Sequence, residues 1–280
     1  MPADTQSLSC HALWTALGHA HSPRLIDVRT AEDFDADPRL LPGAERADWR
    51  TIEHWRPDWP GGPVVVYCQG GLKLSQGAAA LLRWRGIRRV DYLEGGFGAW
   101  RDGGLPLVPK DALPPRDGRG RTVWVTRARP KVDRVACPWL IRRFVDPEAV
   151  FLYVAADQVS LVAERFGAAA FDIPGTRWSH DGEYCSFDTM LRGFGLNCPA
   201  LDRLALVVRG ADTNRPDLAP QAAGLLAACL GLSHLYASDL DQLDAAMPIY
   251  DAFFRWARDA SQESHDWTMP AGGERIGHAR

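Results

Sequence analysis

A cysteine ends a short, strongly apolar run in the first third of the chain. Residues 63–67 (Pro-Val-Val-Val-Tyr) lead directly into Cys68, which is followed by Gln69, Gly70, Gly71, Leu72 and Lys73. A β-branched run predicts a strand buried on both faces of a parallel sheet, and such sheets bind ligands at the carboxyl ends of their strands. Glycines let the next residues curl so that their N–H groups point inward toward an anion. We therefore expect a reactive thiolate at Cys68, with the positive charge of Lys73 on the same loop.

A second set of residues with metal-ligand chemistry occurs further along the chain. His180 and Cys185 lie around a glycine-containing turn, and Asp212 follows a predicted helix. Imidazole, thiolate and carboxylate groups together could hold a transition metal, although their spacing matches no familiar zinc pattern. Two interpretations stay open: a metal site formed by His180, Cys185 and Asp212, or a surface histidine beside a buried structural cysteine.

Positive charge is concentrated in residues 116–143, which contain nine Arg or Lys residues and two Asp in a chain of net charge −3. This predicts an anion-binding face for an oxyanion, with a polar site formed by Arg127, Asp133, Arg134 and Arg142. Alternatively, these arginines pair with carboxylates, either on acidic C-terminal helices or at Asp133 and Asp212. We do not expect nucleic acid as a partner, because the segment shows no known docking motif.

The elements that would position these residues alternate in the first half. Apolar runs and apolar spacing predict strands at 24–28, 63–67 and 90–93 and a helix at 74–84. Such alternation is typical of an α/β domain, a parallel sheet with flanking helices. Residues 109–121 are rich in Pro, Gly and charge, which predicts a linker. The chain beyond them has a mostly helical pattern, which predicts a helix-rich α+β domain.

Length and composition agree with this division. A chain of 280 residues, 46% apolar and 24% charged, has room for two globular domains, which we place at 8–108 and 122–262, with a flexible tail at 263–280. No apolar stretch is long enough to cross a bilayer, and the first residues lack a secretory signal. Six cysteines are too few for a disulfide framework, so we expect the protein to act in a reducing cytoplasm. Because no stretch could span a bilayer, we expect no membrane partner.

Four segments of the first half, taken in order, resemble the rhodanese (sulfurtransferase) family and span about residues 8–108. They are LIDVR at 25–29, LPGA at 41–44, VVVYC with its loop at 64–73, and YLEGGFGAW at 92–100 followed by GGLP. The resemblance implies that Cys68 accepts sulfane sulfur and holds it as a persulfide cradled by the amides of residues 69–73. It also implies that Asp27 and Arg29 support the loop. Lys73 stands where many family members have Arg. A lysine offers an anion a single point charge, whereas an arginine can bind it with two parallel hydrogen bonds.

The second half resembles the C-terminal domain of chromate-resistance proteins of the ChrB type over about residues 120–260. The resemblance is carried by the stretch 122–154, FDIPGTRWSHDGEYCSFDTML at 171–191, Gly210-Ala211-Asp212, and IYDAFFRW at 249–256. It implies a role in sensing or handling chromate. Some proteins of this type are regulators with a DNA-binding N-terminal region. Here a rhodanese-like region occupies that end, so DNA regulation is not carried over.

Together these features predict a two-domain sulfurtransferase. The first domain would carry sulfane sulfur on Cys68 without a cofactor, taking it from a small-molecule donor and passing it to a thiol acceptor. Asp27, Arg29 and Lys73 would complete its catalytic machinery. The second domain would bind a transition metal or an oxyanion that uses, receives or senses the sulfur. The alternative is a binding protein without turnover that senses chromate or oxidative stress through the Cys68 thiol.

Overall fold

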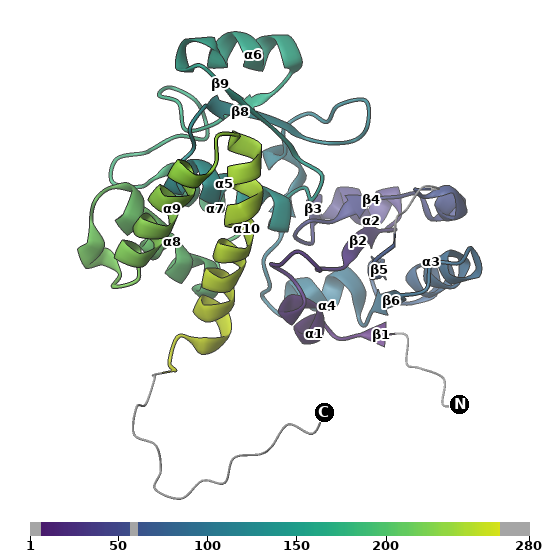
Figure 1. Ribbon diagram of the computed structural model, residues 1–280. Coiled ribbons are helices and arrows are strands. Elements are labelled where there is room, and N and C mark those ends of the chain that lie inside the picture. Colours follow the sequence, from purple (N-terminus) through teal and green to yellow (C-terminus); the bar gives the residue numbers. More distant parts are fainter. Residues whose placement is uncertain (1–6, 57–60, 264–280) are drawn as a thin grey trace, which may run out of the picture.

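The first half of the chain is organised around a parallel five-stranded sheet (Figure 1). The computed structural model describes residues 7–56 and 61–263. The strands lie in the order β1 (Ser7–Leu8), β6 (Val90–Leu93), β5 (Val64–Tyr67), β2 (Arg24–Asp27) and β4 (Glu45–Arg46). The strands predicted at 24–28, 63–67 and 90–93 are confirmed to within one residue at each end.

Successive side chains of the central strand pack on opposite faces of this sheet. Val64 and Val66 of β5 belong to the core that includes Leu82 of α3 (Lys73–Trp84), whereas Val65 and Tyr67 belong to the core on the other face. All four side chains are buried, which confirms that β5 is covered on both sides. The remaining helical elements of this half are α1 (Cys10–Thr15), α2 (Ala31–Ala36), η1 (Trp49–His54) and α4 (Gly96–Asp102).

The second half combines a small parallel sheet with many helices. Strand β8 (Val123–Arg127) lies between β10 (Ala169–Ala170) and β9 (Val150–Val154). The helices are α5 (Val132–Phe144), α6 (Val159–Phe166), α7 (Ser186–Gly193), α8 (Pro199–Asp212), α9 (Ala222–Leu235) and α10 (Asp239–Arg255). The predicted fold class, an α/β parallel-sheet domain followed by a helix-rich α+β domain, is confirmed. Within the described residues, no helix has the length and apolar character needed to cross a membrane.

Helix α5 runs through a proline. Pro138 has no N–H to donate to the carbonyl of Arg134 one turn earlier. The hydroxyl of Tyr153 on β9 donates to that carbonyl at 3.3 Å and replaces the missing bond. The contact also ties α5 to the small sheet, so the helix keeps a fixed position beside the strand ends.

The segment predicted to be a linker, 109–121, is partly packed. Val108–Pro109 form strand β7, which pairs antiparallel with β3 (Arg39–Leu40). The next residues form a short 3₁₀ turn, in which the Lys110 N–H donates to the Pro38 carbonyl at 3.0 Å and Ala112 is buried. The start of the segment is thus bound to the first half. The domain limits themselves stay a prediction, as does the tail at 263–280, which lies outside the described residues except for Glu263.

Aromatic side chains join the two halves in one continuous core. The ring of Trp14 on α1 lies 6.3 Å from that of Phe144 on α5 and 6.2 Å from that of Phe254 on α10. A Cβ atom on Gly18 would lie 2.3 Å from the Phe254 ring, so the turn after α1 closes directly on this ring. Arg258 donates to carbonyls at the C-terminal end of α1, where a cation is favoured. Figure 1 shows α10 running along the junction between the halves.

Truncation of this shared aromatic contact should destabilise both halves together. We expect Phe254→Ala to lower the free energy of unfolding by about 3–5 kcal/mol, because it opens a cavity in a fully packed core. Phe166→Ala, at an exposed ring on α6, should change it by less than about 0.5 kcal/mol. Urea unfolding followed by tryptophan fluorescence and circular dichroism measures both variants. Two separate transitions in the wild-type protein would contradict a shared core.

Candidate functional site

Cys68 lies at the carboxyl end of β5, at the start of the loop that leads into α3. Its side chain is 5% exposed, and its Sγ lies 3.3 Å from the Oγ of Ser75. Ser75 is itself buried in the first turn of α3, and its single hydroxyl hydrogen can be donated either to the sulfur or to the Leu72 carbonyl, which lies 3.2 Å from the Ser75 oxygen. The sulfur is thus positioned by the strand on one side and by the helix N-terminus on the other.

Hydrogen bonds favour the thiolate form of Cys68 over the thiol. Burial by itself raises the pKa of the thiol. The Ser75 hydroxyl and the backbone amides of Ser75, Leu72 and Gly70 act in the opposite direction and outweigh burial, so the net pKa is lowered. Of the amides predicted over 69–73, those of Gly70 and Leu72 therefore act on the sulfur. Ser75 was not predicted; its signal is a serine in the first helical turn after the loop.

The backbone of the loop is held by the first turn of α4. The amide of Phe97 donates to the Cys68 carbonyl at 2.9 Å, and the amide of Gly98 donates to the Gln69 carbonyl at 3.0 Å. Gly71 and Gly96 have φ of +68° and +57°, and a Cβ atom on Gly96 would lie 2.2 Å from the Cys68 carbonyl oxygen. Only glycine allows the two turns to approach this closely.

Asp27 and Arg29 support the loop indirectly. Both are buried, and they form a salt bridge of 2.7 Å at the end of β2. The Arg29 guanidinium lies 3.8 Å from the centre of the Phe97 ring, and Phe97 holds the Cys68 carbonyl through its amide. We therefore treat Asp27 and Arg29 as positioning residues.

The outer side of the loop faces solvent. Leu72 is 65% exposed, Lys73 is exposed at the first position of α3, and Gly70 is exposed as well. The side-chain oxygen of Gln69 is buried and makes no hydrogen bond within the described residues. A small molecule can therefore reach the rim of the loop, where Lys73 supplies the cationic side chain.

A second polar group surrounds His180, in the loop between β10 and α7. Its Nε2 lies 3.5 Å from Asp133 Oδ2, 3.4 Å from Asp172 Oδ1 and 3.4 Å from Asp212 Oδ2. Asp133 lies in the first turn of α5, and Asp212 is the last residue of α8. Asp133, together with Asp212 and Asp172, raises the pKa of His180 to about 9. Burial and the Asp133 carboxylate raise the pKa of Asp212 to about 7.

Asp133 is the most firmly held member of this group. Its side chain is 2% exposed and accepts hydrogen bonds from the backbone amides of Ser186 and Phe187 at 2.8 and 2.9 Å. These amides begin α7, where a negative charge is favoured. Asp172, which was not predicted, pairs with Arg127 at 2.8 Å and Arg134 at 3.2 Å.

Three expectations for the second half need correction. Cys185 is not in the group around His180: its thiol donates to Asp188 at 3.3 Å, and burial raises its pKa well above normal, so it stays a thiol. Asp133 takes its place beside His180 and Asp212. Arg142 lies outside the polar site because it pairs with Asp244 on α10 at 2.8 Å, which confirms the alternative that it pairs with an acidic C-terminal helix. Finally, Arg134 pairs with Asp172 instead of Asp133 or Asp212.

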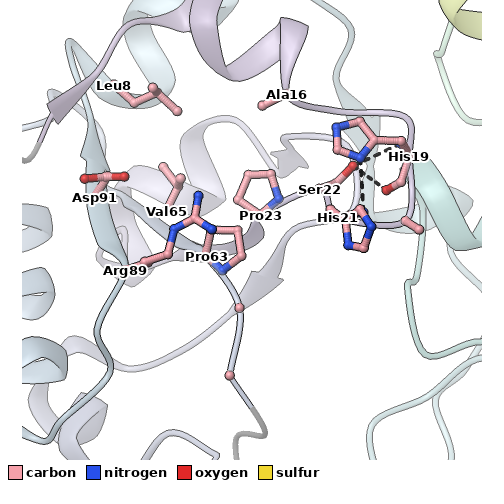
Figure 2. Close-up of a pocket in the computed structure, with 13 residues that line it drawn as sticks. Leu8, Ala16, His19, His21, Ser22, Pro23, Pro63, Val65, Arg89 and Asp91 are labelled. Carbon is pink, nitrogen blue, oxygen red and sulfur yellow. Dashed lines mark hydrogen bonds between the residues drawn. The ribbon is translucent and has the colours of Figure 1, made fainter. Parts of the chain in front are cut away.

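A large cavity lies away from both groups (Figure 2). It has a volume of about 720 Å³ and lies at the amino ends of β2, β5 and β6, opposite the edge that carries Cys68. Figure 2 shows hydrogen bonds that join His19 to Ser22 and His21 to His19 on one side of the cavity. Arg89 and Asp91 lie on the other side.

The Ser75 hydroxyl should control the reactivity of Cys68. We expect the rate of Cys68 alkylation by iodoacetamide to rise with pH around a midpoint below that of a free cysteine, because the thiolate is stabilised. Ser75→Ala should move the midpoint upward, since it removes one donor to the sulfur. Ser22→Ala, at the opposite edge of the sheet, should leave it unchanged. Peptide mass spectrometry over a pH series gives the midpoint, and equal midpoints for Ser75→Ala and wild type would contradict the assignment.

Two variants distinguish the effect of the close contact at Gly96 from the effect of its positive φ angle. Gly96→Ala and Gly104→Ala both place a side chain at positive φ, which costs about 1–2 kcal/mol each. Only the Gly96 variant also clashes with the Cys68 carbonyl, because the space around Gly104 is open. We expect Gly96→Ala to be less stable than Gly104→Ala in thermal unfolding and to lose the lowered alkylation midpoint of Cys68. Equal behaviour of the two would show that the contact is unimportant.

Comparisons with known proteins agree with this two-part organisation. Residues 9–102 match the family described as Rhodanese-like domain, and residues 124–257 match the family described as ChrB, C-terminal domain. Protein ChrB of Cupriavidus metallidurans is 33% identical over 187 residues, which are 60% of this chain and 56% of that protein. The chain thus spans about half the length of that relative.

One further relative and one solved structure each match less than two fifths of the chain. A protein named Sulfurtransferase from Allochromatium vinosum is 31% identical over 106 residues, which cover 38% of this chain and 92% of the relative. The crystal structure of a rhodanese-like domain protein from Staphylococcus aureus is 28% identical, covers 37% of this chain and 97% of that one, and has a TM-score of 0.32. The chain therefore belongs to the rhodanese (sulfurtransferase) family through its first half and carries a ChrB C-terminal domain as its second half.

Proposed function

We propose that this protein transfers sulfane sulfur and that Cys68 is the sulfur carrier. The proposal is carried by one observation: the Cys68 sulfur lies within reach of the Ser75 hydroxyl and of loop amides that together lower its pKa. The same donors that stabilise a thiolate also suit the terminal sulfur of a persulfide, which is likewise an anion. The likeness to a protein named Sulfurtransferase supports this reaction class.

The reaction needs no cofactor. The Cys68 thiolate attacks the outer sulfur of thiosulfate, a new S–S bond forms, and the S–S bond of thiosulfate breaks with its electron pair leaving on sulfite. Cys68 then holds a persulfide anion. A thiolate acceptor attacks the terminal sulfur, which forms the acceptor persulfide and regenerates the Cys68 thiolate. The acceptor's proton goes to solvent, so atoms and charge balance over the cycle.

Some residues around the loop would bind the anionic sulfur or its donor, and others would hold the loop in position. The amides of Gly70 and Leu72 and the Ser75 hydroxyl would stabilise the anion on sulfur. Lys73, exposed at the rim, would attract an anionic donor without the bidentate grip of an arginine. Asp27 and Arg29 would keep the loop in shape through Phe97. All six cysteines lie in the described residues and none is in a disulfide, which supports a reducing cytoplasm as the place of action.

The test is sulfur transfer by the full chain. Wild type with thiosulfate and a small thiol should release sulfite in repeated turnovers, and Cys68→Ser should lose at least about 99% of this rate, because the nucleophile is gone. Cys10→Ser, at a partly exposed cysteine outside the loop, should keep it. Mass spectrometry should show a gain of one sulfur atom on Cys68 after donor alone.

Other results would decide against turnover. Equal sulfite release by wild type and Cys68→Ser would overturn the proposal. If thiosulfate left Cys68 unchanged while chromate or peroxide oxidised it, the protein would instead be a sensor that uses the same activated thiol without catalysis.

A further inference from the structure

Three carboxylates surround the Nε2 atom of His180, which can donate a hydrogen bond to only one of them at a time. Nε2 carries at most one hydrogen and faces oxygens of Asp133, Asp172 and Asp212 at 3.4–3.5 Å. A charge-assisted N–H···O bond is normally about 2.7–2.9 Å long. All three contacts are longer than that, so no single short hydrogen bond from the imidazole accounts for the arrangement.

These separations fit the ligands of one metal ion. Donor atoms that each lie about 2.0–2.2 Å from an ion, at tetrahedral or octahedral angles, are about 3.0–3.5 Å apart. The donor atoms of Asp133, His180 and Asp212 all lie within 4.8 Å of one another, and both contacts to Nε2 fall in or at the edge of the expected range. One ion in place of the Nε2 hydrogen would contact all three groups at once.

The local charges also leave room for a divalent cation. Asp172 already has Arg127 and Arg134 as partners. For Asp133 and Asp212, the cationic group in ion-pair contact among the described residues is His180. Two carboxylates and a neutral imidazole together balance the charge of one divalent ion. The carboxylate of Asp133 is fixed in advance by the two amides of α7, as carboxylate ligands of metals commonly are.

We propose that Asp133, His180 and Asp212 bind one divalent transition-metal ion. Oxygen and imidazole donors suit Mn²⁺, Fe²⁺ and Zn²⁺, whereas the absence of a thiolate, with Cys185 turned toward Asp188, disfavours softer ions such as Cu⁺. The His180 side chain is 42% exposed and that of Asp212 19%, so one side of the ion stays open for water or a substrate atom. The site does not depend on sulfur transfer by Cys68.

Metal titration of the full chain tests this site. Protein treated with EDTA and exchanged into chelator-free buffer is titrated with Zn²⁺ and with Mn²⁺ by isothermal calorimetry. We expect one ion per chain for at least one of them. His180→Ala and Asp212→Asn should each weaken its binding by about tenfold or more, since each removes one of three ligands.

Two matched variants separate this site from other sources of binding. His234→Ala removes an exposed histidine from α9, and Cys185→Ser keeps an N-cap residue on α7 while removing the thiol. Both should bind as the wild type does. If neither ion binds, or if His180→Ala binds as well as His234→Ala, the proposal fails and a protonated His180 is the cation of this group.

A spectroscopic measurement on the wild type covers the case in which a variant does not fold. Co²⁺ added to the metal-free protein should produce visible ligand-field bands without a near-ultraviolet thiolate charge-transfer band. Bands without the thiolate feature support the Asp-His-Asp ligand set. A thiolate band would instead place Cys185 or another cysteine on the metal and overturn the assignment, as would an unchanged spectrum of hexaaqua Co²⁺.

Discussion

The contact between the Cys68 loop and the first turn of α4 fixes the backbone around the sulfur. Two backbone hydrogen bonds join the segments, and a single added Cβ at Gly96 would overlap the carbonyl of Cys68 itself. The contact is possible because β5 and β6 are neighbours in register and end at the same edge of the sheet. With the carbonyls of Cys68 and Gln69 occupied from outside, the loop amides remain directed toward the sulfur. The lowered pKa of Cys68 is thus a consequence of sheet pairing as well as of the loop sequence.

The buried polar pair at the end of β2 extends this constraint into the core. Asp27 orients Arg29, and Arg29 stacks on Phe97, whose amide is one of the two that hold the loop. Burying such a pair is costly unless its geometry and hydrogen bonds are good. Here Arg29 also donates to the carbonyls of Asp37 and Arg39, so the guanidinium is well satisfied. The Asp27–Arg29 salt bridge therefore supports the loop rigidly, while its two charges face each other instead of the Cys68 sulfur.

Helix α5 connects the chemistry of the second half with the rest of the molecule. Its first turn carries Asp133, which is held by the amides of α7. Its last turn carries Phe144, which packs on Trp14 and accepts a hydrogen bond from the Gly43 amide of the first half at 2.7 Å. Helix α5 therefore contributes residues both to the polar group around His180 and to the interface between the halves. The basic segment that contains α5 uses several of its charges internally, as Arg142 with Asp244 and Arg143 with Asp251 illustrate.

Much of the first half could be predicted from sequence because its signals are local. The β-branched run before Cys68, the glycines after it and the helical apolar spacing over 74–84 act within a few residues of one another, so strand, loop and helix were recognisable without knowledge of their neighbours. The second half depends on contacts across the chain. Asp133 and His180 are 47 positions apart and are joined only by the packing of α5 against α7 and α8. Cys185, five residues from His180, turns instead toward Asp188 in the first turn of the helix that it caps.

The sequence by itself thus determined the position of Cys68 at a strand end, its loop and the order of the two folds, because backbone propensity and apolar periodicity act over short distances. The tertiary structure decided which carboxylates surround His180, that Arg142 lies elsewhere, and that the two halves share a core. These outcomes depend on how helices pack, which side chains are left without water, and which charges must then find a partner. Spacing along the chain carries little of that information.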